Sequence, residues 1–164
     1  MLPRNPLTAV LIAFVLALGV NLWYFITGTD LSMVVSRTIF ADLLLVLSMV
    51  PIYESMRLKL TSDTETTPNR IKAGMKAVLI YALLLAVATF ILFKLFGDPL
   101  VGERISLLRE MLDASPDMTE ELKQQRIETA RSIYSPGTHT LAVIIGTLFT
   151  GLISSVLAAV VVRR

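Results

Sequence analysis

Residues 96–136 read FGDPLVGERISLLREMLDASPDMTEELKQQRIETARSIYSP and form the one long charge-rich segment of the chain, with apolar runs on both sides. Asp98 followed by Pro99 is typical of a helix start, because an acidic side chain caps the first amides and proline has no amide to leave unpaired. A second helix is expected to follow and to end at about Tyr134. The segment 98–134 therefore predicts an amphipathic helical hairpin in water, held between two membrane spans.

Each arm of this predicted hairpin carries an apolar stripe at helical spacing. The stripes comprise Val101, Ile105, Leu108 and Leu112 in the first arm, and Met118, Leu122, Ile127, Ala130 and Tyr134 in the second. The second helix is expected to open at Ser115 or Asp117, since Asp117 and Glu120 have capping-box spacing. The stripes could dock on the outer leaflet or bind a partner. We favour the simpler interpretation, in which the two helices pack on each other and cap the bundle.

The composition is that of a membrane protein. The chain has 164 residues, 54% of them hydrophobic, and a mean hydropathy of +0.70, which is far from a soluble globular profile. It contains no cysteine, which excludes disulfides, thiolate metal sites and cysteine nucleophiles. The net charge is only +2, and the basic residues lie at helix ends. We therefore expect no nucleic-acid partner.

Four apolar segments are long enough to cross about 30 Å of hydrocarbon as helices. They lie at residues 7–27, 36–56, 73–96 and 138–162. The loop 57–72 is rich in basic residues, and short loops of this kind stay in the cytoplasm. Both chain ends are then cytoplasmic, and the hairpin is extracytoplasmic. A secretory signal peptide is the alternative for the first segment, and the length of that segment disfavours it.

Five polar or charged side chains fall in the outer half of the predicted spans. They are Asn21, Arg37, Asp42, Lys94 and His139. If these residues converge, Asp42 could pair with Arg37 or His139 as a protonatable site open to the outside. The alternative is a structural role, with polar side chains hydrogen-bonded between helices. We favour the structural role, on the ground that no second carboxylate in a span continues a proton path.

The last predicted span has small residues at every fourth position, namely Thr147, Gly151, Ser155 and Ala159. They leave one helix face smooth enough for close backbone approach. This face could meet the third span of the same chain or a second copy of the protein. We favour contact within the chain.

The order of the segments resembles the DUF4199 family of small bacterial membrane proteins. The residues that carry the resemblance are Arg70-Ile71-Lys72-Ala73-Gly74-Met75-Lys76, which lead into the third span, and Ser135-Pro136-Gly137, which open the last. The resemblance implies a four-helix, multi-pass protein of the cell inner membrane. It implies no activity and supplies no catalytic residues.

The residue inventory disfavours an enzyme, because the chain has one histidine and none of the metal-ligand or nucleophile motifs of known hydrolases. We expect no cofactor and no metal site. The leading hypothesis is a non-enzymatic scaffold or accessory subunit of the lipid bilayer, whose outer hairpin contacts a membrane protein partner or the leaflet. The alternative is a small oligomeric transporter or channel that uses Asp42 and its neighbours. A third hypothesis is a sensor that moves at a kink expected near Leu47 to Pro51.

Overall fold

The computed structural model describes residues 7–27, 50–61, 66–115 and 118–161, and all the regular structure in these ranges is α-helical. The helices are α1 (Leu7–Thr27), α3 (Val50–Thr61), α4 (Thr67–Asp113), α5 (Glu120–Ile133) and α6 (Pro136–Val161). Three of them, α1, α4 and α6, are long and apolar enough to cross a membrane. The segment expected to span at 36–56 falls largely outside the described residues, as do Arg37, Asp42 and part of the expected kink.

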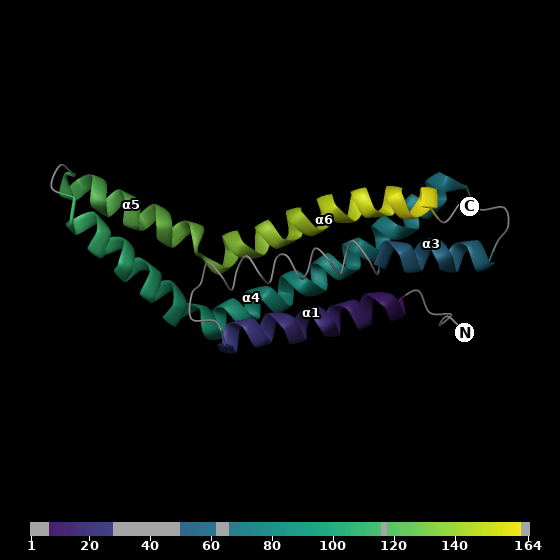
Figure 1. Cartoon of the computed structure of the whole chain (residues 1–164), viewed down its shortest axis with the longest axis horizontal. Coiled ribbons are helices and arrows are strands. Elements are labelled where there is room, and N and C mark those ends of the chain that lie inside the picture. Colours follow the sequence, from purple (N-terminus) through teal and green to yellow (C-terminus); the bar gives the residue numbers. More distant parts are fainter. Residues whose placement is uncertain (1–6, 28–49, 62–65, 116–117, 162–164) are drawn as a thin grey trace.

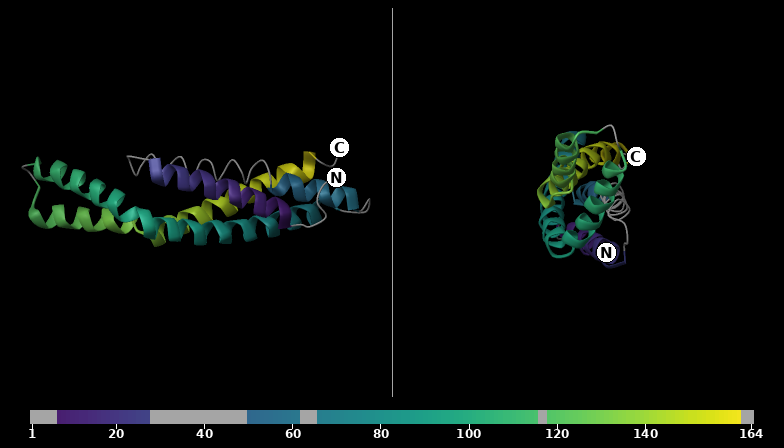
Figure 2. Two further views of the ribbon diagram at one scale, coloured as in Figure 1. Left: turned by 90° about the horizontal axis from the view of Figure 1, so that it is seen from below. Right: turned by 90° about the vertical axis from the view of Figure 1, so that its left-hand side faces the viewer.

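The helices form an elongated bundle with a hairpin beyond one end (Figure 1). In the bundle, α4 packs against α1, α3 and α6. The second half of α4 pairs with α5 to make the hairpin, which extends past the end of the bundle (Figure 1 and the left view of Figure 2). At the opposite end of the molecule, α3 ends at Thr61, α4 begins at Thr67 and α6 ends at Val161 (Figure 1).

The bundle has a small core and an apolar exterior. Its buried cluster comprises Val10, Ala13, Ala17, Val50, Ala77, Val78, Tyr81, Leu85 and Val143. Large apolar side chains also point outward along all three long helices, for example Val15 of α1, Val87 of α4 and Phe149 of α6. An apolar exterior of this extent is unfavourable in water and favourable against lipid tails. The long apolar helices therefore indicate a membrane protein.

The prediction that a helix ends at Phe96 and a new one begins at Asp98 is wrong. α4 is one helix of 47 residues with Pro99 inside it, which corresponds to a length of about 70 Å. Proline removes a single backbone hydrogen bond, and a helix tolerates that loss by bending. α4 changes direction where it passes from the bundle into the hairpin (Figure 1).

The loop predicted at 57–72 is also shorter than expected, because its polar residues belong to helices on both sides. α3 continues to Thr61, and α4 begins at Thr67 with Pro68 in its first turn, a position where a missing amide costs nothing. The second hairpin helix begins at Glu120, later than Ser115 or Asp117. The Thr119 hydroxyl accepts a hydrogen bond from the Leu122 amide at 3.4 Å and caps α5.

Candidate functional site

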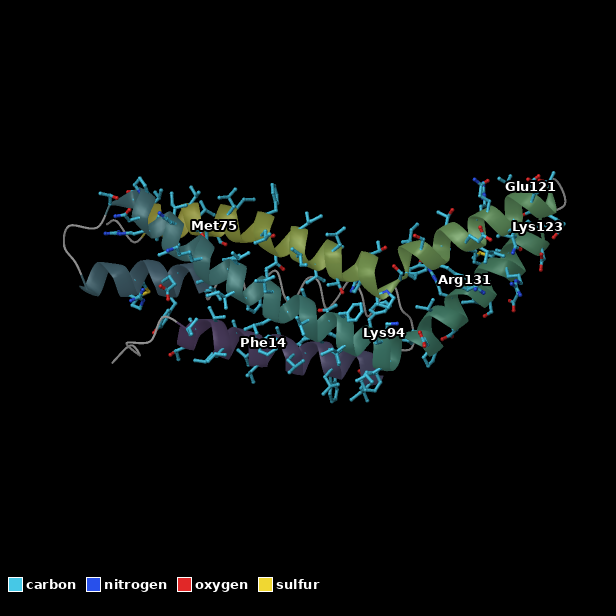
Figure 3. All side chains as sticks on the ribbon, turned by 180° about the vertical axis from the view of Figure 1, so that it is seen from behind. Phe14, Met75, Lys94, Glu121, Lys123 and Arg131 are labelled. Atoms are coloured by element: carbon cyan, nitrogen blue, oxygen red, sulfur yellow. The ribbon has the colours of Figure 1, made fainter. Side chains whose placement is uncertain are left out.

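Three of the five residues in the predicted polar set lie among the described residues. Asn21 is buried in α1, where its Nδ2 donates a hydrogen bond to the Ala17 carbonyl at 2.8 Å. His139 is buried at the start of α6, and Lys94 is exposed on α4 (Figure 3). Arg37 and Asp42 lie outside the described residues.

Phe93 organises the region where the bundle meets the hairpin. Its ring centroid lies 4.9 Å from that of His139, with the two rings tilted by 39°. Leu18 and Tyr24 of α1 and Tyr134 after α5 pack against the same cluster. The cluster of Leu92 and Phe93 thus joins α1 to α4, and Phe93 contacts α6 at His139. We call this region the elbow and define it by Phe93, Gly97, Tyr134 and His139.

Gly97 leaves room for this arrangement. A Cβ atom on Gly97 would lie 2.7 Å from Cδ1 of Phe93 and 3.1 Å from Cε1, distances at which real atoms overlap. Gly102, five residues later in the same helix, would bring a Cβ atom to nothing within 4 Å. Gly97 is therefore required by packing at the elbow, whereas Gly102 faces open space.

The small residues of the last helix lie on its buried face. Thr147, Gly151, Ser155 and Ala159 are all buried, and Gly151 lies directly against Val78 of α4. The Ser155 hydroxyl has no hydrogen-bond partner among the described residues. At Gly151 this face therefore packs closely against α4 within the same chain.

A buried ion pair at the opposite end of the bundle was missed by the sequence analysis. Glu54 of α3 is 2% exposed, and its Oε2 accepts hydrogen bonds from Arg57 Nε at 3.1 Å and Nη2 at 3.0 Å. Its other carboxylate oxygen, Oε1, has no partner among the described residues. Glu54 lies inside the span predicted at 36–56, so the ground that no second carboxylate occurs in a span was wrong. The acid and the arginine three residues later were the available signal.

The hairpin is closed by its own small core and by ion pairs at its tip. Ile105 and Leu112 of α4 pack against Ile127 of α5. Lys123 Nζ lies 2.7 Å from Glu120 Oε1 and 3.6 Å from Asp113 Oδ1. The hydrogen bond to Glu120, followed by the charges of Glu120 and Asp113, raises the pKa of Lys123 above its ordinary value of 10.5, and desolvation opposes the rise.

A groove of about 540 Å³ runs along the hairpin between α4 and α5. Gly102 and Ser106 of α4 line it together with the charged residues Asp98, Arg109 and Glu110, and Arg131 of α5 contributes from the other arm. Arg131 lies in the last turn of α5, away from the tip, and Lys123 lies nearer the tip (Figure 3). Asp98, Arg109, Glu110 and Arg131 form no ion pair with any residue that the structure describes.

Comparisons and metal-ligand geometry add no chemistry to this picture. Within the described ranges, no three histidine, aspartate or glutamate side chains lie close enough together to hold a metal ion. No family model matches the chain, and neither the curated proteins nor the solved structures contain a match. The resemblance to the DUF4199 family stays a prediction from the sequence pattern.

Proposed function

We propose that the protein is a non-enzymatic scaffold or accessory subunit of the cell inner membrane, and that its hairpin contacts a membrane partner or the outer leaflet. The observation that carries this proposal is the continuity of α4, which runs from a membrane-spanning length into the hairpin without a loop. Because the helix is continuous, a movement of the membrane segment of α4 also moves the hairpin surface at its other end. A loop at Asp98 would not couple the two parts in this way.

Exposed apolar side chains on the hairpin support a contact surface there. Leu107 and Met111 of α4 are 43% and 62% exposed, and Leu122 and Ile133 of α5 are 40% and 58% exposed. These side chains lie outside the hairpin core, which other residues fill. Apolar side chains that remain outside the core of a two-helix hairpin are available to a partner helix or to the leaflet.

The proposed topology has four spans, cytoplasmic chain ends and an extracytoplasmic hairpin. It is supported by the basic residues near the α3–α4 connection, Arg57, Arg70, Lys72 and Lys76, since such clusters favour the cytoplasmic side. It is also supported by the end of α3 and the start of α4, which lie at the opposite end of the molecule from the hairpin (Figure 1).

Topology is tested by single cysteines, because the chain has none of its own. Asn69→Cys and Glu121→Cys are both at exposed positions. In intact cells, a membrane-impermeant maleimide is expected to label Glu121→Cys and to reach Asn69→Cys only after the inner membrane is permeabilised. Labelling of both positions from the same side would contradict the topology.

Partner contact is tested by photo-crosslinking from the hairpin in cells. A benzophenone amino acid at Met111 or Ile133 is expected to capture one stoichiometric membrane protein, or lipid if the hairpin contacts the leaflet. The same group at Leu157, which is exposed on α6 in the bundle, is the control and is expected to capture lipid. A hairpin probe that captures neither protein nor lipid would refute the proposal.

A second candidate function, oligomeric transport, is favoured by the burial of Glu54. A carboxylate that is 2% exposed, with one oxygen unpartnered among the described residues, is costly inside a membrane and is often functional when present. In this candidate, Glu54 joins Asp42 as a second acid in the same span. Proteoliposomes are expected to show proton or cation flux that Glu54→Gln abolishes and Glu121→Gln leaves intact. Absence of flux in the unmodified protein would exclude transport.

A further inference from the structure

The groove on the hairpin brings two arginines to neighbouring levels from different helices. The ion pair between Asp113 and Lys123 sets the register of the two arms. Eight residues further from the tip on each arm, Ile105 on α4 stands level with Arg131 on α5. Arg109 lies one helical turn nearer the tip than Ile105, a separation of about 6 Å along the axis. Both arginines line the groove.

Small residues of α4 line the groove beside these arginines. Gly102 and Ser106 are one turn apart on α4 and both line the groove. A Cβ atom on Gly102 would meet nothing within 4 Å, and the Ser106 hydroxyl is turned back onto its own helix, where it donates to the Glu103 carbonyl at 2.8 Å. A ligand can therefore approach the backbone here without displacing a side chain.

Carboxylates stand at both ends of the groove. Asp98 lies toward the membrane-spanning part of α4, and Glu110 lies toward the tip. Neither forms an ion pair among the described residues, and the same holds for Arg109 and Arg131. The groove thus offers two arginines, Asp98 toward the bundle, and Glu110 and Asp113 toward the tip, and of these carboxylates Asp113 is already paired with Lys123. That pattern matches a ligand with an anionic group next to a cationic one.

We infer that this groove binds a zwitterionic phosphoethanolamine group, with the phosphate between Arg109 and Arg131 and the ammonium at Glu110. Guanidinium groups are suited to phosphate because they donate paired hydrogen bonds in a plane. The volume of about 540 Å³ lies in the range of small-molecule sites. This inference does not depend on a protein partner for the hairpin.

The group could come from a phospholipid or from a soluble molecule. The first source is favoured by position, because Asp98 lies just beyond the apolar part of α4, where lipid headgroups lie if α4 spans the membrane. Val101 and Ile105, which also line the groove, give an apolar surface beside the charged residues. The two sources share the headgroup chemistry, and binding measurements separate them.

Native mass spectrometry of the full chain in detergent tests the inference. The probes are phosphatidylethanolamine, phosphatidylglycerol, which lacks the ammonium, and soluble phosphoethanolamine. Phosphatidylethanolamine is expected to bind about tenfold more tightly than phosphatidylglycerol, a factor typical of one charge-assisted hydrogen bond. If soluble phosphoethanolamine displaces phosphatidylethanolamine at a similar concentration, the ligand is a soluble molecule. If phosphatidylethanolamine binds and soluble phosphoethanolamine does not displace it, the ligand is the lipid.

Two classes of variant locate the binding. Arg109→Gln and Arg131→Gln are each expected to weaken binding of phosphatidylethanolamine by about tenfold, whereas Arg126→Gln, an exposed arginine on α5 outside the groove lining, leaves it unchanged. Gly102→Leu fills the groove beside the arginines and is expected to block binding. Gly137→Leu, whose Cβ atom would also meet nothing within 4 Å, is its control.

The inference is overturned if the three groove variants bind phosphatidylethanolamine as tightly as the unmodified chain. It is also overturned if none of the probes binds, or if phosphatidylglycerol binds as tightly as phosphatidylethanolamine. Circular dichroism of each variant confirms that loss of binding is not loss of helix. Since Gly102 and the arginines lie outside the buried cores of the hairpin and bundle, these variants are expected to keep the fold.

Discussion

Val78 of α4 and Gly151 of α6 lie so close together that a Cβ atom on Gly151 would stand 2.8 Å from Cγ2 of Val78 and closer still to Cγ1. Val78 is fully buried and belongs to the core cluster of the bundle. Between lipid tails there is no hydrophobic driving force for helix association, so close packing of this kind holds spans together. The contact between α4 and α6 is therefore expected to be sensitive to a single methyl group.

Gly151→Ala is predicted to destabilise the bundle by about 1–3 kcal/mol, the usual cost of overpacking. Alanine has a higher helix propensity than glycine, by about 1 kcal/mol, so propensity alone would stabilise the variant. A loss of stability therefore reports the packing clash. Unfolding of the full chain by sodium dodecyl sulfate in mixed micelles measures it. Gly19→Ala, at an exposed position of α1 with open space around it, is the control. Equal stability of the two variants would contradict the prediction.

Gly97→Ala is predicted to displace the Phe93 ring from the elbow and to cost about 1–3 kcal/mol. Phe93 is only 1% exposed, so its ring has little space into which it can turn. Gly102→Ala in the same helix is predicted to be neutral or stabilising, by up to about 1 kcal/mol. The same unfolding assay compares the two. Phe93→Leu combined with Gly97→Ala is expected to recover part of the loss, and no recovery would show that the clash is not with this ring.

The apolar helices could be predicted from the sequence because a long uncharged run has few other stable structures in lipid. α1 has the bounds Leu7–Thr27 that its uncharged run indicates. The small residues from Thr147 to Ala159 likewise indicated a buried face, and they are buried, with Gly151 against Val78 of α4. Periodicity reports which side of a helix packs. It does not identify the neighbour.

The helix ends could not be predicted as well, because local signals there compete with tertiary packing. Asp98-Pro99 is typical of a helix start, yet α4 continues through the proline. Beyond the proline, Leu100 and Val101 pack against the cluster of Leu92 and Phe93. The groove could not be predicted at all, since Arg109 and Arg131 are 22 positions apart in the sequence. They line the same groove only because the two arms of the hairpin pair in this register. The burial of Glu54 could not be predicted either, because the sequence places an acid near the end of the segment 36–56 without showing which way its side chain points.

The hairpin tip is predicted to loosen at high pH. The pKa of Lys123 is raised, first by its hydrogen bond to Glu120, so its stabilising effect is complete below about 10.5, the unfolded value. That effect is lost as the pH rises through the higher folded value. The change is expected to be small, because Glu120 and Asp113 are exposed, by 86% and 62% of their side chains.

Electron paramagnetic resonance measures this loosening as the distance distribution between spin labels at Met111 and Gln124, two exposed positions on opposite arms. The distribution is expected to be narrow at pH 8 and broader above the raised pKa. In Lys123→Met it is expected to be broad at both pH values. A distribution in this variant that still broadens with pH would assign the effect to another group.

Arg57→Gln is predicted to destabilise the protein more than Glu54→Gln, although both remove the same ion pair. The arginine substitution leaves a carboxylate that is 2% exposed without its charged partner, which costs about 3 kcal/mol, the lower end of the range for buried pairs because Arg57 is partly exposed. Glu54→Gln instead leaves the Arg57 guanidinium, whose side chain is 22% exposed. This substitution is expected to cost about 1 kcal/mol of stability.

The double variant Glu54→Gln, Arg57→Gln separates the loss of attraction from the burial of an unpaired charge. It is expected to be more stable than Arg57→Gln alone, because the glutamine at position 54 no longer requires a counterion. Glu120→Gln removes an exposed acid paired with Lys123 and is the matched control, with an effect within about 0.5 kcal/mol. Unfolding in mixed micelles measures all four variants. A double variant less stable than Arg57→Gln would mean that residue 54 is stabilised by groups other than Arg57, and that its carboxylate is not a buried charge in need of a partner.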